Sequence, residues 1–250
     1  MDVFFNEIRA DLITRHPNLR YYGGFRFDMD RARTDAWQPF RTCRFVVPQF
    51  EIGRLGNRYY FAYNVLVEAD ECPADYLDDA LRYIDGIELP AAELDMPLPE
   101  VADRVDRPDA EAWHTIVGAA LSELKTTPLQ KVVLARESRF SFSQPLDPTA
   151  LLGALIANTT FSFHYAFQFD GQSAFIGASP ERLYKRTSTC LKSEALAGTR
   201  PRVPEPEQNE MLGRELLRSP KERLEHQFVV DHVRNAFDEY CRAVRGGDKT

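Results

Sequence analysis

The sequence is poor in cysteine, the residue that cross-links small proteins through disulfides. Four of its 250 residues are cysteines, they lie far apart, and none belongs to a CxxC pair. This spacing excludes a disulfide scaffold and argues against a zinc site built on thiolates. The histidines do not change this, because His226 and His232 are six residues apart and would point in different directions on a helix. A bound metal would therefore be a hard ion held by carboxylates.

The sequence also lacks the marks of several large functional classes. It has no GxSxG, Walker or GxGxxG motif, so the common nucleophilic and phosphate-binding templates find no support. Lys and Arg number 31 against 38 Asp and Glu, the formal net charge is −7, and no basic block occurs; we expect no nucleic-acid partner. No apolar run approaches the roughly 20 residues of a membrane helix, and the N-terminal residues lack a signal-peptide layout. We expect a cytoplasmic protein that does not bind a membrane.

Apolar side chains, in contrast, are numerous enough to fill a core. Hydrophobic residues make up 44% and aromatic residues 12% of the sequence, which excludes wholesale disorder. Strand and helix patterns are mixed without regular βαβ alternation, so we expect an α+β fold. The stretch 85–111 carries nine acidic residues and four prolines, as a surface connection does. We therefore expect a strand-rich part, 1–105, and a second part, 106–250, that carries the polar motifs.

Local signals predict individual helices and strands. The clearest is the start of the last helix, where Ser219 can act as the N-cap, Pro220 takes the first helical position and Glu222 the third, from which it should complete the cap. Spacing of apolar, β-branched and aromatic residues predicts further helices over 1–20, 75–84, 109–125 and 147–157, and strands over 44–50, 58–67, 131–136, 161–169, 173–177 and 181–191.

Four polar signals stand in apolar or turn-forming segments, and each has an ordinary explanation. Lys131 opens the apolar run to Arg136; such a lysine is commonly a solvated strand end, and the functional alternative is a general base whose pKa is lowered by partial desolvation. Glu181 stands on a turn after a strand, where most glutamates are simply exposed. Glu222 and Glu225 are three apart, so they are neighbours on a helix and either could ligate a divalent cation, although a charged helix face is the commoner explanation.

The fourth signal is the glycine turn in Glu194–Arg202. Gly198 would let the backbone approach a ligand closely, and the adjacent amides could bind a carboxylate. Taken alone, this segment is simply a turn. None of the four signals decides the function singly.

Together and in order, these segments resemble the motifs of the chorismate-utilising enzymes, which include isochorismate, salicylate and anthranilate synthases. The resemblance runs from Leu129 to about Val233, and it implies the chorismate-binding fold of antiparallel sheets flanked by helices, here incomplete at the C-terminus. The segments that carry it are Lys131–Arg136, Gly177–Leu183, Glu194–Arg202 and Lys221–Val230.

Two positions choose a branch within this family. By resemblance, members that use water as the nucleophile have lysine at the position of Lys131, and the aminodeoxychorismate branch has lysine at the position of Ala197. The pair found here therefore implies water as the nucleophile, and the run Glu194–Arg202 looks most like isochorismate synthases of the menaquinone type. One departure is Val203, where a glycine is common.

The resemblance also implies roles. It implies isomerisation of chorismate to isochorismate, with Mg²⁺, for menaquinone or siderophore biosynthesis. Lys131 would be the general base and Glu181 the general acid, and Glu225 would hold the metal. The substrate carboxylate would be bound by Ala197, Gly198 and Thr199.

The chain length departs from the resemblance, and it leaves alternatives open. By resemblance, family members continue well beyond the helix predicted to end near Ala243, and that continuation supplies a second magnesium carboxylate, whereas this chain stops at Thr250. We therefore expect that the 250-residue chain alone does not turn chorismate over, and that a complementing C-terminal portion would be needed. The alternatives are a salicylate synthase, which also eliminates pyruvate, and a non-catalytic fragment of a chorismate-binding domain.

Overall fold

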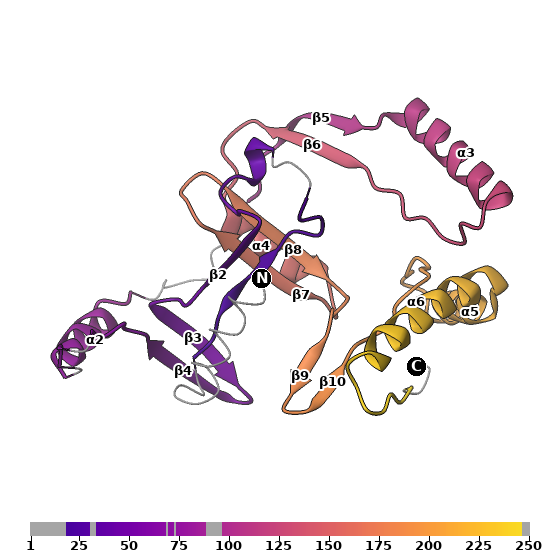
Figure 1. Ribbon diagram of the computed structural model, residues 1–250. Helices are drawn as coiled ribbons and strands as arrows, with labels where there is room; N and C mark the ends of the chain where they lie inside the picture. Colours follow the sequence, from indigo (N-terminus) through magenta and orange to yellow (C-terminus); the bar gives the residue numbers. More distant parts are fainter. Residues whose placement is uncertain (1–18, 31–33, 69, 73, 89–96, 247–250) are drawn as a thin grey trace. The chain divides into compact units, whose positions relative to one another are not determined.

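A computed structural model describes residues 19–30, 34–68, 70–72, 74–88 and 97–246 (Figure 1). The chain divides into two compact units: Met1–Met96 with Ala166–Phe175, and Pro97–Tyr165 with Ile176–Thr250. Helices and two-stranded sheets alternate irregularly in both, which confirms the α+β class. The helix predicted over 1–20 lies almost wholly outside the described residues.

The first unit is built on two antiparallel strand pairs. Strands β1 (Tyr22–Phe25) and β2 (Cys43–Val46) form one pair, and β3 (Phe50–Leu55) and β4 (Arg58–Tyr63) form a hairpin. A short 3₁₀ helix, η1 (Asp35–Trp37), and helix α2 (Asp75–Asp85) complete the unit. The Phe50 ring stacks on its cross-strand partner Tyr63 and meets Tyr83 of α2 edge-on, so aromatic contacts attach the helix to the hairpin.

The second unit carries the polar motifs. Strand β5 (Val101–Arg107) pairs antiparallel with β6 (Glu137–Phe142), and helix α3 (Ala110–Thr126) lies between them in sequence. Helix α4 (Pro148–Asn158) precedes the paired strands β7 (Phe163–Gln168) and β8 (Ala174–Ser179), whose connecting tip belongs to the first unit. The small hairpin of β9 (Lys185–Thr187) and β10 (Cys190–Lys192) leads to helices α5 (Pro206–Arg218) and α6 (Pro220–Asp238).

Three helices begin at a side-chain N-cap, of which the cap at Ser219 was expected from the sequence. The side chains of Asp109, Asp147 and Ser219 accept hydrogen bonds from backbone amides in the first turns of α3, α4 and α6. Such caps satisfy amides that a helix leaves without an internal partner. The predicted helices over 75–84, 109–125 and 147–157 are confirmed, as is the helix that begins after Ser219.

Two predicted strands are wrong. The run 131–136 forms no strand, and pairing with β5 begins only at Glu137. An apolar run becomes a strand only where a neighbouring strand supplies the hydrogen-bond ladder. The strand predicted over 181–191 is instead the β9–β10 hairpin, in which Ser188 takes a positive φ of 52°. The expected surface connection 85–111 contains β5, so the expected division after residue 105 falls inside a strand of the second unit.

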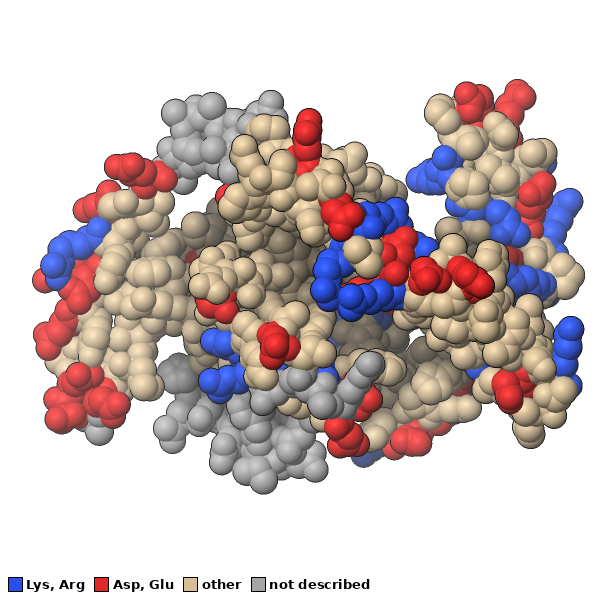
Figure 2. Space-filling view, turned by 90° about the horizontal axis from the view of Figure 1, so that it is seen from above, with Lys and Arg blue, Asp and Glu red and all other residues tan. Residues whose placement is uncertain are grey.

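Burial in the described part of the chain is unusual. No apolar side chain there is buried, and the two buried side chains are those of Glu51 and Glu222, each 8% exposed. Figure 2 shows acidic and basic side chains side by side at several places on the face in view. No helix among the described residues is both long and apolar enough to cross a membrane.

Candidate active site

The first two turns of α6 present the polar residues of the last motif. Ser219 Oγ accepts from Glu222 N at 3.4 Å, and Pro220 takes the first helical position. The Glu222 carboxylate does not return to the cap as a capping box would require, because it bonds to a side chain from another segment. The expected role of Glu222 as a helix cap is therefore limited to its backbone amide.

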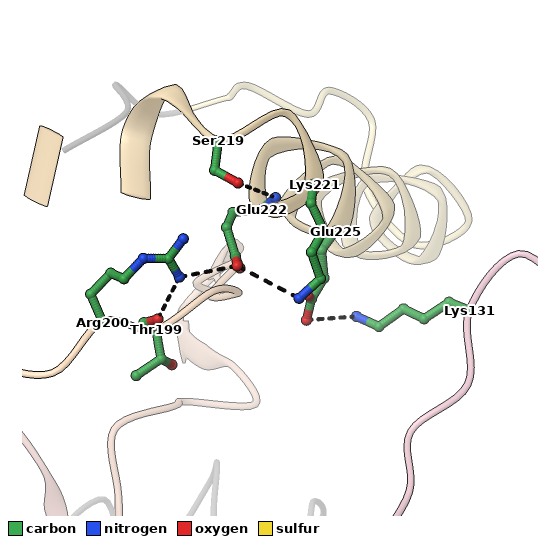
Figure 3. Close-up of polar contacts among 7 residues, drawn as sticks. All are labelled: Lys131, Thr199, Arg200, Ser219, Lys221, Glu222 and Glu225. Atoms are coloured by element: carbon green, nitrogen blue, oxygen red, sulfur yellow. Dashed lines mark hydrogen bonds and ion pairs between the residues drawn. The ribbon is translucent and has the colours of Figure 1, made fainter. Parts of the chain in front are cut away.

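Glu225 of α6 faces the lysine of the first motif. Glu225 Oε1 lies 4.0 Å from Lys131 Nζ, and the two side chains are 38% and 34% exposed (Figure 3). The predicted general base and the predicted metal ligand thus come together from distant parts of the sequence. Because water reaches both groups, the attraction between them is screened and contributes little to stability.

The glycine turn of the third motif lies against the same helix. Gly198 has a φ of +82°, and a Cβ at this position would lie 2.8 Å from Glu222 Oε2 and 3.1 Å from Leu216 Cδ1. Only glycine adopts this conformation without strain. The sequence predicted that Gly198 makes room for a ligand; its close neighbours here are side chains of α5 and α6.

Arg200 ties the end of this turn to α6. Arg200 Nη1 donates to Glu222 Oε1 at 3.1 Å and to Thr199 O at 2.9 Å, and Lys221 Nζ lies 3.6 Å from the same carboxylate oxygen (Figure 3). The hydrogen bond from Arg200 holds the pKa of the Glu222 carboxyl below its usual range, against burial, which raises it. The pairing keeps the Glu222 carboxylate ionised and hydrogen-bonded to Arg200.

A second contact ties the beginning of the turn to the helix. His226 Nε2 lies 3.1 Å from Ala195 O, and because a carbonyl oxygen only accepts, the ring nitrogen must carry the proton. The spacing of His226 and His232 argued against a shared metal site, and this half-buried contact is compatible with a packed role for His226. The contacts of Arg200 and His226 with the turn were not predicted from the sequence. The one pattern that points to them is the four-residue spacing of Glu222 and His226, which places both on one face of the helix.

Glu181 stands apart from this group. Its backbone amide donates to Ser179 Oγ at 3.2 Å in the turn after β8, and its side chain is exposed. Among the described residues, no hydrogen bond or ion pair joins its carboxylate to Lys131. The adjacent Arg182, however, pairs with Glu194 at 3.4 Å, so the second motif is attached to the beginning of the third.

Near Lys131, one carboxylate is suitable as a ligand for a hard cation. No group of three or more His, Cys, Asp or Glu within the described ranges could hold a metal. Glu222 is engaged by Arg200 at 3.1 Å, whereas the contact of Glu225 with Lys131 is longer, at 4.0 Å, and exposed, so Glu225 is the more accessible carboxylate. Mg²⁺ retains several waters and often takes only one or two protein carboxylates, so Glu225 is compatible with it as a single ligand.

Comparison with known proteins agrees with the motifs. Residues 2–249 match the family described as chorismate binding enzyme, and the chain therefore belongs to that family. It is 33% identical over 248 residues to isochorismate synthase 2, chloroplastic, of Arabidopsis thaliana, covering 96% of the chain and 44% of that protein. It is 32% identical over 232 residues to isochorismate synthase MenF of Bacillus subtilis (strain 168), covering 91% of the chain and 48% of that protein.

The fold agrees as well. The structure of MenF, the menaquinone-specific isochorismate synthase from Escherichia coli, superposes with a TM-score of 0.77 at 25% identity, covering 95% of this chain and 52% of that one. The chorismate-binding fold expected from the motifs is therefore confirmed, and it is partial. The chain spans about half the length of the curated relatives it matches.

Proposed function

We propose that the protein carrying this chain converts chorismate to isochorismate, for menaquinone or siderophore biosynthesis. The observation that carries the proposal is the match of residues 2–249 to the chorismate binding enzyme family. Two of the motif residues, Lys131 and Glu225, lie 4.0 Å apart, Nζ to Oε1. The names of the matched relatives support the same reaction.

The chemistry requires an acid and a base on opposite sides of a ring. Water adds at C2 of chorismate, and the hydroxyl at C4 leaves. Neutral Lys131 takes a proton from the attacking water, and protonated Glu181 gives one to the departing hydroxyl, which leaves as water. Such a division needs two groups whose environments separate their pKa values.

The remaining residues bind the substrate. The segment Ala197, Gly198 and Thr199 binds a substrate carboxylate through backbone amides, as anion-binding turns do. Glu225 would hold Mg²⁺, which would neutralise charge on the ring carboxylate and help to orient the ring.

The central test is substitution of the base. In the protein that carries these residues, Lys131→Ala should lower the rate of isochorismate formation by roughly 10²–10⁴-fold, the usual contribution of a positioned acid or base. Lys131→Gln should do the same. Lys125→Ala is the matched control, because Lys125 is exposed in the last turn of α3, and it should keep full activity. Wild-type rates in both Lys131 variants would overturn the proposal.

The 250 residues alone should not turn chorismate over. A magnesium ion held by a single helical glutamate binds weakly, because affinity for hard cations rises with the number of carboxylates. The site is also open to water, which screens its charges. The chain should be assayed alone and with a separately expressed C-terminal portion of a relative, for isochorismate, salicylate and pyruvate. Activity only in the mixture supports a complementing portion, salicylate with pyruvate supports the salicylate synthase, and inactivity in both supports a non-catalytic domain.

A further inference from the structure

Helix α6 contacts the segment Ala195–Arg200 at two points one helical turn apart. The Glu222 carboxylate accepts from Arg200 at 3.1 Å, and the His226 ring donates to Ala195 O at 3.1 Å. Residues four apart share one face of a helix. A single face of α6 therefore holds both ends of the segment.

Arg200 links the Glu222 carboxylate to the backbone of the segment. The same nitrogen, Nη1, donates to Glu222 Oε1 and, at 2.9 Å, to Thr199 O (Figure 3). Glu222 is one of the two buried side chains in the described part of the chain. A buried carboxylate without partners is costly in free energy. The guanidinium of Arg200 therefore stays hydrogen-bonded to this carboxylate, and the Thr199 carbonyl stays bonded to the same guanidinium.

The glycine in the middle of the segment fits this arrangement. At Gly198, φ is +82° and a Cβ would lie 2.8 Å from Glu222 Oε2. Because glycine has no side chain, the carboxylate can lie close to the backbone at this position. Glu222 thus contacts the segment through Arg200, and its carboxylate occupies space that a side chain at position 198 would need.

We propose that Glu222 and His226 are positioning residues that fix the backbone of Gly198 and Thr199 for binding of a substrate carboxylate. The inference rests on the proposed function of that segment. Donors that are already in place bind an anion without the cost of ordering a loop. In this role neither residue touches the reacting atoms, and both act through the segment.

The direct test is hydrogen exchange of the segment in the full 250-residue chain, without substrate. Glu222→Gln and Arg200→Gln should each speed exchange of the Gly198 and Thr199 amides by about tenfold or more, because the segment then opens locally. The double variant should exchange no faster than the singles, since the two side chains act as one unit. His226→Phe should speed exchange at the beginning of the segment.

A matched control separates this effect from loss of any ion pair. Glu210→Gln removes an exposed pair with Arg214, at 3.6 Å within α5, and should leave exchange in the segment as in the wild type. Exchange in α4 serves as the internal reference for unfolding. If a glutamine variant also opens α4, Arg200→Lys, which keeps the charge but loses the guanidinium geometry, should still speed exchange only in the segment. Wild-type exchange in the segment of these variants, or multiplied effects in the double variant, would overturn the proposal.

Kinetics provide a readout that a merely structural role would not move. In the active protein, Glu222→Gln should raise KM for chorismate by about tenfold with kcat within about twofold, as does the loss of an interaction made equally in the ground state and the transition state. An unchanged KM would overturn the positioning role. Failure of the isomerase proposal can be distinguished from failure of the positioning role. The isomerase proposal is tested by the activity of the Lys131 variants, whereas hydrogen exchange is measured without turnover.

Discussion

Replacing Gly198 by alanine tests the geometry of the candidate site with a single methyl group. The backbone φ of +82° is in the left-handed region, which costs a residue with a Cβ roughly 1–3 kcal/mol. The new methyl would also lie 2.8 Å from Glu222 Oε2 and 3.1 Å from Leu216 Cδ1. Both neighbours would have to move, so the conformational cost is a lower limit to the loss of stability.

Urea unfolding measures this loss directly. With a denaturant dependence of about 2 kcal/mol per molar urea, a loss of about 1–3 kcal/mol lowers the unfolding midpoint by roughly 0.5–1.5 M. The control is Gly153→Ala in α4, where a Cβ meets nothing within 4 Å. Alanine there should raise stability by about 0.5–1 kcal/mol, because glycine is a poor helix residue. Equal midpoints for Gly198→Ala and the wild type would refute the reasoning, since they would mean that neither the strain nor the contact with α6 exists.

Three further outcomes are expected. Glu225→Gln keeps the size of the side chain but removes the charge that a hard cation needs, so the apparent magnesium affinity of the active protein should fall sharply; an unchanged affinity would leave Glu225 as part of a solvated helix face. Hydrogen bonds from Ser138 and then Arg104 lower the pKa of Asp106, so the stability it gives the β5–β6 pair is present above the usual aspartate range and is lost as pH falls through the lowered pKa. Exchange across these strands should therefore rise on acidification below about pH 4 in the wild type and less in Asp106→Asn. Asp147→Ala should cost about 1 kcal/mol by circular dichroism melting, because Asp147 Oδ1 accepts from two amides of α4; no change in the melting curve would show that this cap is dispensable.

Features that depend on neighbouring residues were predictable from the sequence. The N-caps of α3, α4 and α6 need only a side chain and the amides two or three residues further on, and the helices they begin occur where expected. The run after Lys131 was predicted to be a strand because its apolar pattern is local. Whether it forms a ladder depends on a partner far away in sequence, and β5 pairs only from Glu137 onwards.

The same distinction holds in the candidate site. The motifs indicated Lys131, Gly198 and Glu225, and the structure brings the lysine to Glu225 and the glycine to α6. The role of Glu222 could not be predicted, because a helical glutamate at the third position has an adequate local explanation as a cap. Its pairing with Arg200 spans 22 positions, and no local pattern encodes that distance.

The hairpin of β7 and β8 decides how the two units can be separated. The backbone passes from one unit to the other at Met96/Pro97, at Tyr165/Ala166 and at Phe175/Ile176. Within the first unit, the borrowed tip supplies Phe169 and Phe175, whose rings contact Phe40. A proteolytic cut at Met96/Pro97 would separate residues 1–96 from 97–250, yet residues 166–175 of the first unit would stay covalently attached to the second. Each unit is made of two separate stretches of sequence, so an exchange of one unit between two such proteins by recombination would have to transfer two stretches of gene at once.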